Sequence, residues 1–153
     1  MAKKLTASLF AVIAFFAAAS VGYAQRNVTP AIERDPVLEA DANHNLDVAR
    51  NAYKLKKAYK GVIMRFEETY AAYPDFSKID EFLYLAGMSS YLLSINKGNQ
   101  RVDLTSEREK DKYAPEKLKE DAIAYFGTII EKYPQSSYRD KADEAMKLLK
   151  APQ

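Results

Sequence analysis

A pattern that repeats at a fixed spacing is the feature that most restricts what this chain can fold into. The pattern F-x6-Y-P-x2-S-x2-D begins at Phe66 and again at Phe126, sixty residues later and in one register. A fixed period is the signature of repeat architectures, in which each unit buries its apolar face against the next unit. The sequence therefore predicts two copies of one supersecondary unit.

Each copy of the pattern encodes two helices joined by a sharp turn. The apolar residues before each Tyr-Pro pair are spaced by three and four, which places them on one stripe of a helix. Because proline disfavours the α conformation of the residue before it, the helices are expected to end near Tyr73 and Tyr133. Ser77 and Ser137 are predicted to cap the helices that follow, and each has an aspartate three residues further on.

The apolar pattern between Val37 and Tyr73 could continue as one helix, but that helix would exceed the usual length of about 8–20 residues. A tight bend near residues 56–58 is the preferred interpretation, since it gives two antiparallel helices. The next helix is apolar on more than one face and is expected to be central, with Gly98 ending it. This helix and two later ones are predicted over residues 79–96, 115–132 and 138–150.

Residues 99–114 form a highly charged insertion, NQRVDLTSEREKDKYA, between two predicted helices. The segment has little apolar content and is long for a helix–helix connection. A solvated surface loop is the simpler interpretation, and a binding element is the alternative.

The N-terminus has the pattern of a targeting segment. Residues 1–24 combine two lysines, an apolar run over 5–19 and small residues at the cleavage positions, which predicts a signal peptide cut before Gln25. An uncleaved membrane anchor is the alternative, but the run is shorter than the ~20 residues that a spanning helix needs. Residues 25–36 are interpreted as a linker or arm, followed by a helical domain over 37–153. Such a protein would be exported to the periplasm or cell envelope of a bacterium.

The composition excludes several classes of protein. With 48% hydrophobic and 29% charged residues the chain is typical of a globular domain, and a formal charge of +2 is too small to indicate nucleic-acid binding. The sequence contains no cysteine, so it offers no residue for a disulfide or for lipid attachment through a thioether.

No arrangement of residues predicts chemistry, and neither a metal nor a cofactor is expected. His44 is the only histidine, and the carboxylates near it do not have the spacing of metal ligands. The neighbouring carboxylates Glu67 and Glu68, and likewise Glu116 and Glu120, are best explained as solvated helix faces beside lysines. A hydrolase that uses such a carboxylate pair is the alternative from another functional class.

A basic cluster is a candidate for interaction with an acidic partner surface or with anionic lipid headgroups, although solubility alone can explain it. The cluster consists of Arg50, Lys54, Lys56, Lys57, Lys60 and Arg65. Most of the tyrosines are expected to be core residues or to contact neighbouring helices.

The residues of the predicted helices resemble a known family of repeats. One set of residues looks like a tetratricopeptide unit: Leu46, Ala49, Tyr53, Val62, Phe66, Thr69 and Pro74. A second set resembles another such unit: Leu83, Ala86, Gly87, Tyr91, Ala122, Phe126 and Pro134. The charged insertion separates the two helices of the second unit, and the last helix resembles a capping half-repeat. Segments such as AYKGVIMRFEETYAAYP and EFLYLAGMSSYLL are similar to the tetratricopeptide (BamD-like) lipoprotein family of outer-membrane β-barrel assembly. The resemblance covers residues 46–149.

This resemblance implies an all-α fold of about two and a half antiparallel helix hairpins, in which the first helix of each pair lines a concave face. The residues that it places in a partner-binding groove are Asp47, Asn51, Lys54, Tyr84, Met88 and Tyr91. The implied function is a non-catalytic protein–protein interaction scaffold of the cell envelope, related to outer-membrane β-barrel assembly. A periplasmic adaptor of a cell-wall or division system is the alternative.

The chain departs from this family in two respects. The family attaches lipid to a cysteine after its signal peptide, and no cysteine is present here. Association with a membrane is therefore expected only through a partner or through an uncleaved N-terminal segment. The family also has more repeats, which suggests that self-association or a bound partner completes the core.

Overall fold

The computed structural model describes residues 34–150, which form helices and connecting turns and contain no strand. The predicted signal peptide, and the arm as far as residue 33, lie outside the described residues. The elements are α2 (Pro36–Asn51), the π-helical turn η1 (Ala52–Lys56), α3 (Tyr59–Ala72), α4 (Ile79–Ser94), α5 (Glu107–Tyr113), α6 (Pro115–Lys132) and α7 (Arg139–Lys150). The predicted all-α fold class is confirmed.

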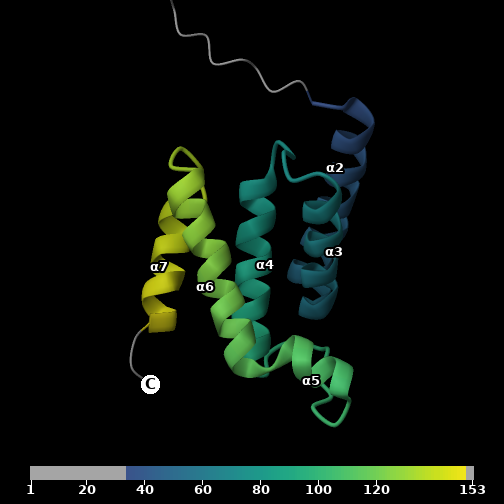
Figure 1. Cartoon of the computed structure of the whole chain (residues 1–153), viewed down its shortest axis with the longest axis vertical. Coiled ribbons are helices and arrows are strands. Elements are labelled where there is room, and N and C mark those ends of the chain that lie inside the picture. The colour runs from purple at the N-terminus through teal and green to yellow at the C-terminus, as the bar shows by residue number, and fades with distance from the viewer. Residues whose placement is uncertain (1–33, 151–153) are drawn as a thin grey trace, which may run out of the picture. The chain divides into compact units, whose positions relative to one another are not determined.

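The long helices are arranged as antiparallel hairpins that pack side by side in chain order (Figure 1). α2 and α3 form the first hairpin, α4 and α6 form the second, and α7 packs against α6 as a half-unit. α4 lies in the middle, between α3 and α6, which explains why its apolar residues cover more than one face. We call α2, α4 and α7 the first helices, and α3 and α6 the second helices.

Helix α2 begins at the end of the segment interpreted as an arm. The Asp35 carboxylate accepts hydrogen bonds from the backbone N–H groups of Val37 and Leu38, at 2.8 and 3.3 Å. Pro36 follows at the first helical position, where its missing N–H has no cost. The side chain of Arg34 also donates to the carbonyl of Asp75 at 3.0 Å. Residues 34–36 are therefore held by the helical domain.

The bend between α2 and α3 lies where the sequence predicted it. The helix widens into η1, Lys57 adopts the left-handed conformation with φ of 49°, and the Ala58 N–H donates to Ala52 at 2.9 Å. A left-handed non-glycine residue costs roughly 1–2 kcal/mol. The surrounding packing compensates for this cost, and the first and second predicted helices are separate.

The two Tyr-Pro turns have the same backbone hydrogen bonds at the same sixty-residue offset. The N–H of Tyr73 donates to Thr69 at 2.8 Å, and that of Tyr133 donates to Ile129 at 3.0 Å. Past the turn, the N–H of the first helical residue donates to the carbonyl three residues earlier, at 3.1 Å in the first turn and 3.2 Å in the second. The sequence repeat is therefore also a structural repeat.

The predicted serine caps are wrong. Ser77 donates its hydroxyl to Glu39 at the start of α2, and Ser137 is exposed. The residue before α4 is Lys78, whose side chain makes no capping hydrogen bond. The physical reason is that carbonyls within each turn already accept from the first helical amides, so that no serine is needed there.

Most apolar side chains form one core between the hairpins. Phe66 lies near its centre, 5.6 Å from Phe82 and 4.9 Å from Tyr125 between ring centroids. Phe126 is fully buried at the equivalent position of the second unit. A smaller cluster joins Tyr59, Ile63, Leu93, Tyr113 and Leu118 at one end of the molecule.

The charged insertion is not the solvated loop that the sequence predicted. It contains α5, buries Tyr113 and packs Val102 against the smaller cluster. Two ion pairs join it to α3: Lys60 to Glu109 at 2.6 Å and Lys112 to Glu67 at 2.5 Å. The prediction failed because a single buried tyrosine and complementary charges on another helix give no periodic signal.

The end of α4 also differs from the prediction. The helix ends at Ser94, and Asn96 supplies the left-handed residue, with φ of 56°. Gly98 lies in the following loop, also at positive φ, and does not itself end the helix.

Candidate partner-binding site

The six residues predicted to line a groove form two rows on neighbouring first helices. Asp47, Asn51 and Lys54 are exposed on α2 and η1, at steps of four and three that keep them on one face. Tyr84, Met88 and Tyr91 follow the same steps on α4, but they are half-buried and pack against the main core. The first row therefore presents solvent-exposed polar side chains, whereas the second contributes partly covered apolar and aromatic surface.

An ion pair between Arg50 and Glu81 joins the two rows. The guanidinium binds the carboxylate in a bidentate manner, with Nε to Oε1 at 2.6 Å and Nη2 to Oε2 at 2.5 Å. Its third nitrogen, Nη1, donates to Asp47 at 2.6 Å. Bidentate pairing is geometrically specific, so it fixes the relative position of α2 and α4 on this face.

The same contact sets the protonation of both groups. The hydrogen bond from Arg50 lowers the pKa of Glu81, against the opposing effect of burial. The hydrogen bond to Glu81 raises the pKa of Arg50 above its already high value. Both residues are therefore charged throughout the physiological range.

Aromatic contacts extend the face from α4 to the start of α7. The rings of Tyr84 and Tyr138 are 5.2 Å apart between centroids, and the ring of Phe126 lies 6.0 Å from that of Tyr84. The hydroxyl of Tyr138 is close enough to Glu81 to lower the pKa of that carboxylate further. Burial raises the pKa of Tyr84 and of Tyr138, and that of Tyr53 to about 12, so these tyrosines remain neutral hydrogen-bonding groups.

The structure thus brings Asp47 and Tyr84 into one connected set of contacts through residues that were not among those predicted to line the groove. Those residues are Arg50, Glu81 and Tyr138. A signal for the first two existed: Glu81 lies three residues before Tyr84, and Arg50 three after Asp47, so each extends a predicted row by one helical step.

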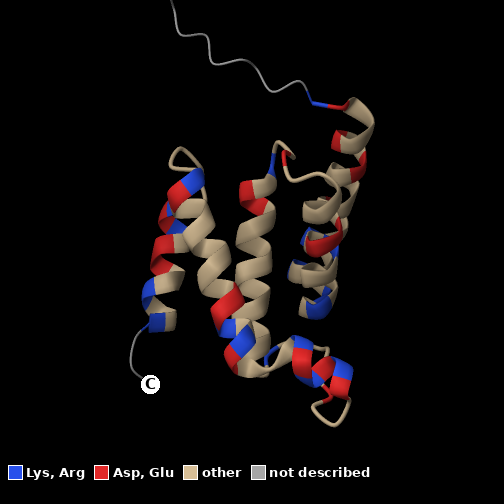
Figure 2. Ribbon diagram, in the orientation of Figure 1, with Lys and Arg blue, Asp and Glu red and all other residues tan. Residues whose placement is uncertain are grey.

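Three of the four carboxylates considered for catalysis are held in separate ion pairs, and the fourth, Glu120, is exposed on α6. Glu67 binds Lys112, Glu68 binds Arg65 at 2.9 Å, and Glu116 lies 3.4 Å from Lys119. His44 is exposed on α2. Within residues 34–150, no three side chains of the His, Cys, Asp or Glu type lie close enough to hold a metal ion. Figure 2 shows acidic and basic residues interspersed on α5 and α7, whereas most of α4 is uncharged.

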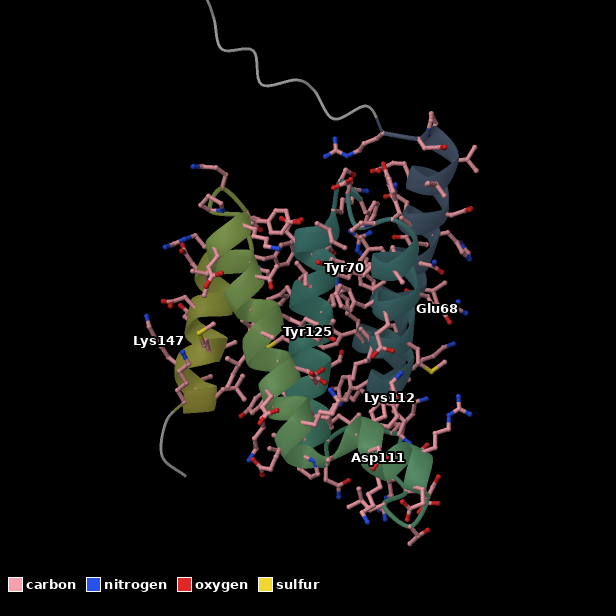
Figure 3. All side chains as sticks on the ribbon, in the orientation of Figure 1. Glu68, Tyr70, Asp111, Lys112, Tyr125 and Lys147 are labelled. Carbon is pink, nitrogen blue, oxygen red and sulfur yellow. The ribbon has the colours of Figure 1, made fainter. Side chains whose placement is uncertain are left out.

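The side-chain view shows the face formed by the second helices (Figure 3). On this face, Glu68 belongs to α3 and Tyr125 belongs to α6.

Among the helices of the described part of the chain, none has the length and hydropathy to cross a membrane.

Comparison with known protein families identifies a match to most of the chain. Residues 12–152 match the family described as YfiO, outer membrane lipoprotein. No curated protein and no solved structure matches the chain. The family match spans both Tyr-Pro turns, the charged insertion and all the first and second helices described above. The chain therefore belongs to the YfiO family of outer membrane lipoproteins.

Proposed function

We propose that the chain is a non-catalytic protein–protein interaction scaffold of the bacterial cell envelope, related to the assembly of outer-membrane β-barrel proteins. The observation that carries this proposal is the family match over residues 12–152, in a chain whose first helices α2 and α4 are joined by the ion pair between Arg50 and Glu81. A rigid helical array is well suited to binding, because its surface is formed before a partner arrives.

The residues of this face suit recognition of an extended or helical protein segment. Tyr84, Met88 and Tyr91 offer aromatic and thioether surface that adapts to different side chains. Asp47, Asn51 and Lys54 form a polar border beside them. In this proposal the partner's apolar residues lie along α4 and its polar groups contact α2.

A role without catalysis is supported by the state of the carboxylates. Glu67, Glu68 and Glu116 are each paired with a lysine or an arginine, and Glu120 is exposed to solvent on α6, whereas a general acid and base must be positioned together at a reacting group. The proposed location is the periplasm or the periphery of the outer membrane. No cofactor is part of the proposal.

Crosslinking inside cells tests the proposed face. A photoreactive residue at Met88, and separately at Asn51, is expected to capture protein components of outer-membrane β-barrel assembly. The matched control is the same residue at Glu68, which is exposed on α3 among the second helices. Capture of cell-wall or division proteins at Met88 would favour the periplasmic adaptor instead. Equal capture at Met88, Asn51 and Glu68 would contradict a specific face.

A further inference from the structure

Five exposed basic side chains gather at the end of the first hairpin, at the turn that joins α2 to α3. Lys54, Lys56 and Lys57 belong to this turn, and Lys97 and Arg101 belong to the loop after α4. We call these five residues the basic end. Figure 2 shows basic residues at this end of the hairpin, near α5.

Direct hydrogen bonds hold the loop against the turn. The backbone N–H of Asn99 donates to the carbonyl of Lys57 at 2.9 Å, and the Asn99 side chain donates to Lys56 at 2.8 Å. The side chain of Gln100 accepts from the backbone of Gly61 at 3.2 Å. Lys97 and Arg101 lie within two residues of these contacts, so segments forty residues apart contribute to one basic surface.

Gly98 is required for this close approach. Its φ of 99° is unfavourable for residues with a side chain, and a Cβ atom there would lie 2.7 Å from the carbonyl oxygen of Lys57 and 2.6 Å from the Tyr59 ring. The juxtaposition of the two segments is thus built into the backbone.

The two segments contain no acidic residue that could neutralise the basic end from within. Residues 48–66 and 82–102 have neither aspartate nor glutamate. The other bases nearby are paired: Lys60 with Glu109, Arg50 with Glu81 and Arg65 with Glu68. Within residues 34–150, no ion pair involves a member of the basic end. Its charge is therefore available to an outside partner.

Leu55 is an exposed apolar residue within the turn that carries three of the five bases. It is 78% exposed, more than the other exposed large apolar side chains of the described helices, and lies between Lys54 and Lys56 in η1. A lone apolar side chain bordered by lysines matches a bilayer surface, where leucine enters the acyl boundary and ammonium groups remain among phosphates. A protein groove would instead need a larger apolar area than one leucine provides.

We propose that the basic end is a contact site for an anionic phospholipid bilayer, with Leu55 entering the interface and the five bases binding lipid phosphates. This contact differs from the proposed partner face, and Lys54 is the one residue that the two sites share. Each base near an anionic surface strengthens binding several-fold, so replacing Lys56 and Lys57 by glutamine should weaken vesicle binding roughly 30-fold.

Fluorescence tests the contact directly, because the chain contains no tryptophan. Leu55→Trp in the full chain is expected to shift its emission to the blue on vesicles of phosphatidylglycerol, and not on vesicles of phosphatidylcholine. Leu148→Trp is the matched control, since Leu148 is 66% exposed on α7, the last helix of the array. A residue at this control position should show no shift even if the N-terminal segment binds the vesicles.

Two outcomes would overturn the proposal. The first is an equal shift, or no shift, for both tryptophan variants on anionic vesicles. The second is binding of Leu55→Trp to an acidic polypeptide such as polyglutamate, but not to the vesicles, which would identify an acidic protein as the partner.

The contribution of the lysines is tested in the Leu55→Trp variant. Changing Lys56 and Lys57 to glutamine in this variant should reduce the shift in emission on anionic vesicles. Replacing Lys141 and Lys150 on α7 by glutamine should leave it unchanged.

Discussion

In the first Tyr-Pro turn Phe76 is buried in the core, whereas the second turn has Ser136 at the equivalent place. The hydroxyl of Ser136 donates to Asp80 at 2.6 Å and accepts from the N–H of Tyr138 at 3.0 Å. The backbone hydrogen bonds of the two turns nevertheless match one for one. One backbone is therefore stabilised in two ways, by apolar burial in the first turn and by a polar network in the second.

Both turns are also tied to the start of the preceding first helix. Ser77 of the first turn bonds Glu39 near the start of α2, and Ser136 of the second bonds Asp80 near the start of α4. The contact is conserved in kind but uses serines that differ by one position in the repeat. The sixty-residue repeat therefore determines the backbone of the turn, whereas the neighbouring side chains determine which of its residues bonds the carboxylate of the first helix.

The largest expected effects test what the two units share. Phe66→Ala and Phe126→Ala should each lower the free energy of unfolding by about 3–5 kcal/mol, because both rings are buried and their removal leaves a cavity. Chemical denaturation of each variant measures the loss. A loss below about 1 kcal/mol for either one would show that the two phenylalanines are not equivalent core positions.

Two helical glycines test how tightly each unit is packed. A Cβ atom on Gly87 of α4 would lie 2.7 Å from the ring of Phe126, so Gly87→Ala should destabilise the fold by about 1–3 kcal/mol. Gly61→Ala on α3 is the matched control, since nothing lies within 4 Å of its Cβ position. That change should stabilise the protein by roughly 0.5–1 kcal/mol, and thermal melts of both variants would show opposite shifts.

Removing the serine of each turn compares how much the polar network of the second turn and the exposed serine contact of the first contribute to stability. Ser136→Ala removes a charge-assisted hydrogen bond and a backbone contact in a partly buried place, and should cost about 1–2 kcal/mol. Ser77→Ala removes an exposed contact and should cost less than about 0.5 kcal/mol. Equal losses in denaturation experiments would mean that the two turns depend on their serines to the same degree.

The smallest effect concerns the pH dependence of the ion pair between the units. Because Arg50 lowers the pKa of folded Glu81 below its ordinary value of 4.5, the pair stabilises the fold above that value and loses its effect as pH falls through the lowered pKa. The difference in free energy of unfolding between wild type and Glu81→Gln should therefore be largest near neutral pH and shrink in acid. A difference that stays constant down to pH 3 would contradict this assignment.

Periodic features of the structure could be predicted from the sequence, because periodicity is a local property. The steps of three and four predicted the helices, and proline placed their ends at Tyr73 and Tyr133. The bend at Lys57 was predicted from helix length alone. The rows of the candidate site were also predicted, since residues on one face of one helix are fixed by spacing.

Contacts between helices were decided only by the tertiary structure. Three contacts each link residues at least thirty positions apart, and no local pattern encodes them: Arg50 with Glu81, Tyr113 in one cluster with Tyr59, and Asn99 with the first hairpin. The predicted serine caps were wrong for a related reason, because backbone carbonyls of each turn accept hydrogen bonds from the amides that the serines were expected to bind.

The sequence by itself determined the helices and their repeat, because helical spacing is set by short-range geometry. Which charges remain free at the basic end, and which are paired, was determined by packing between distant segments.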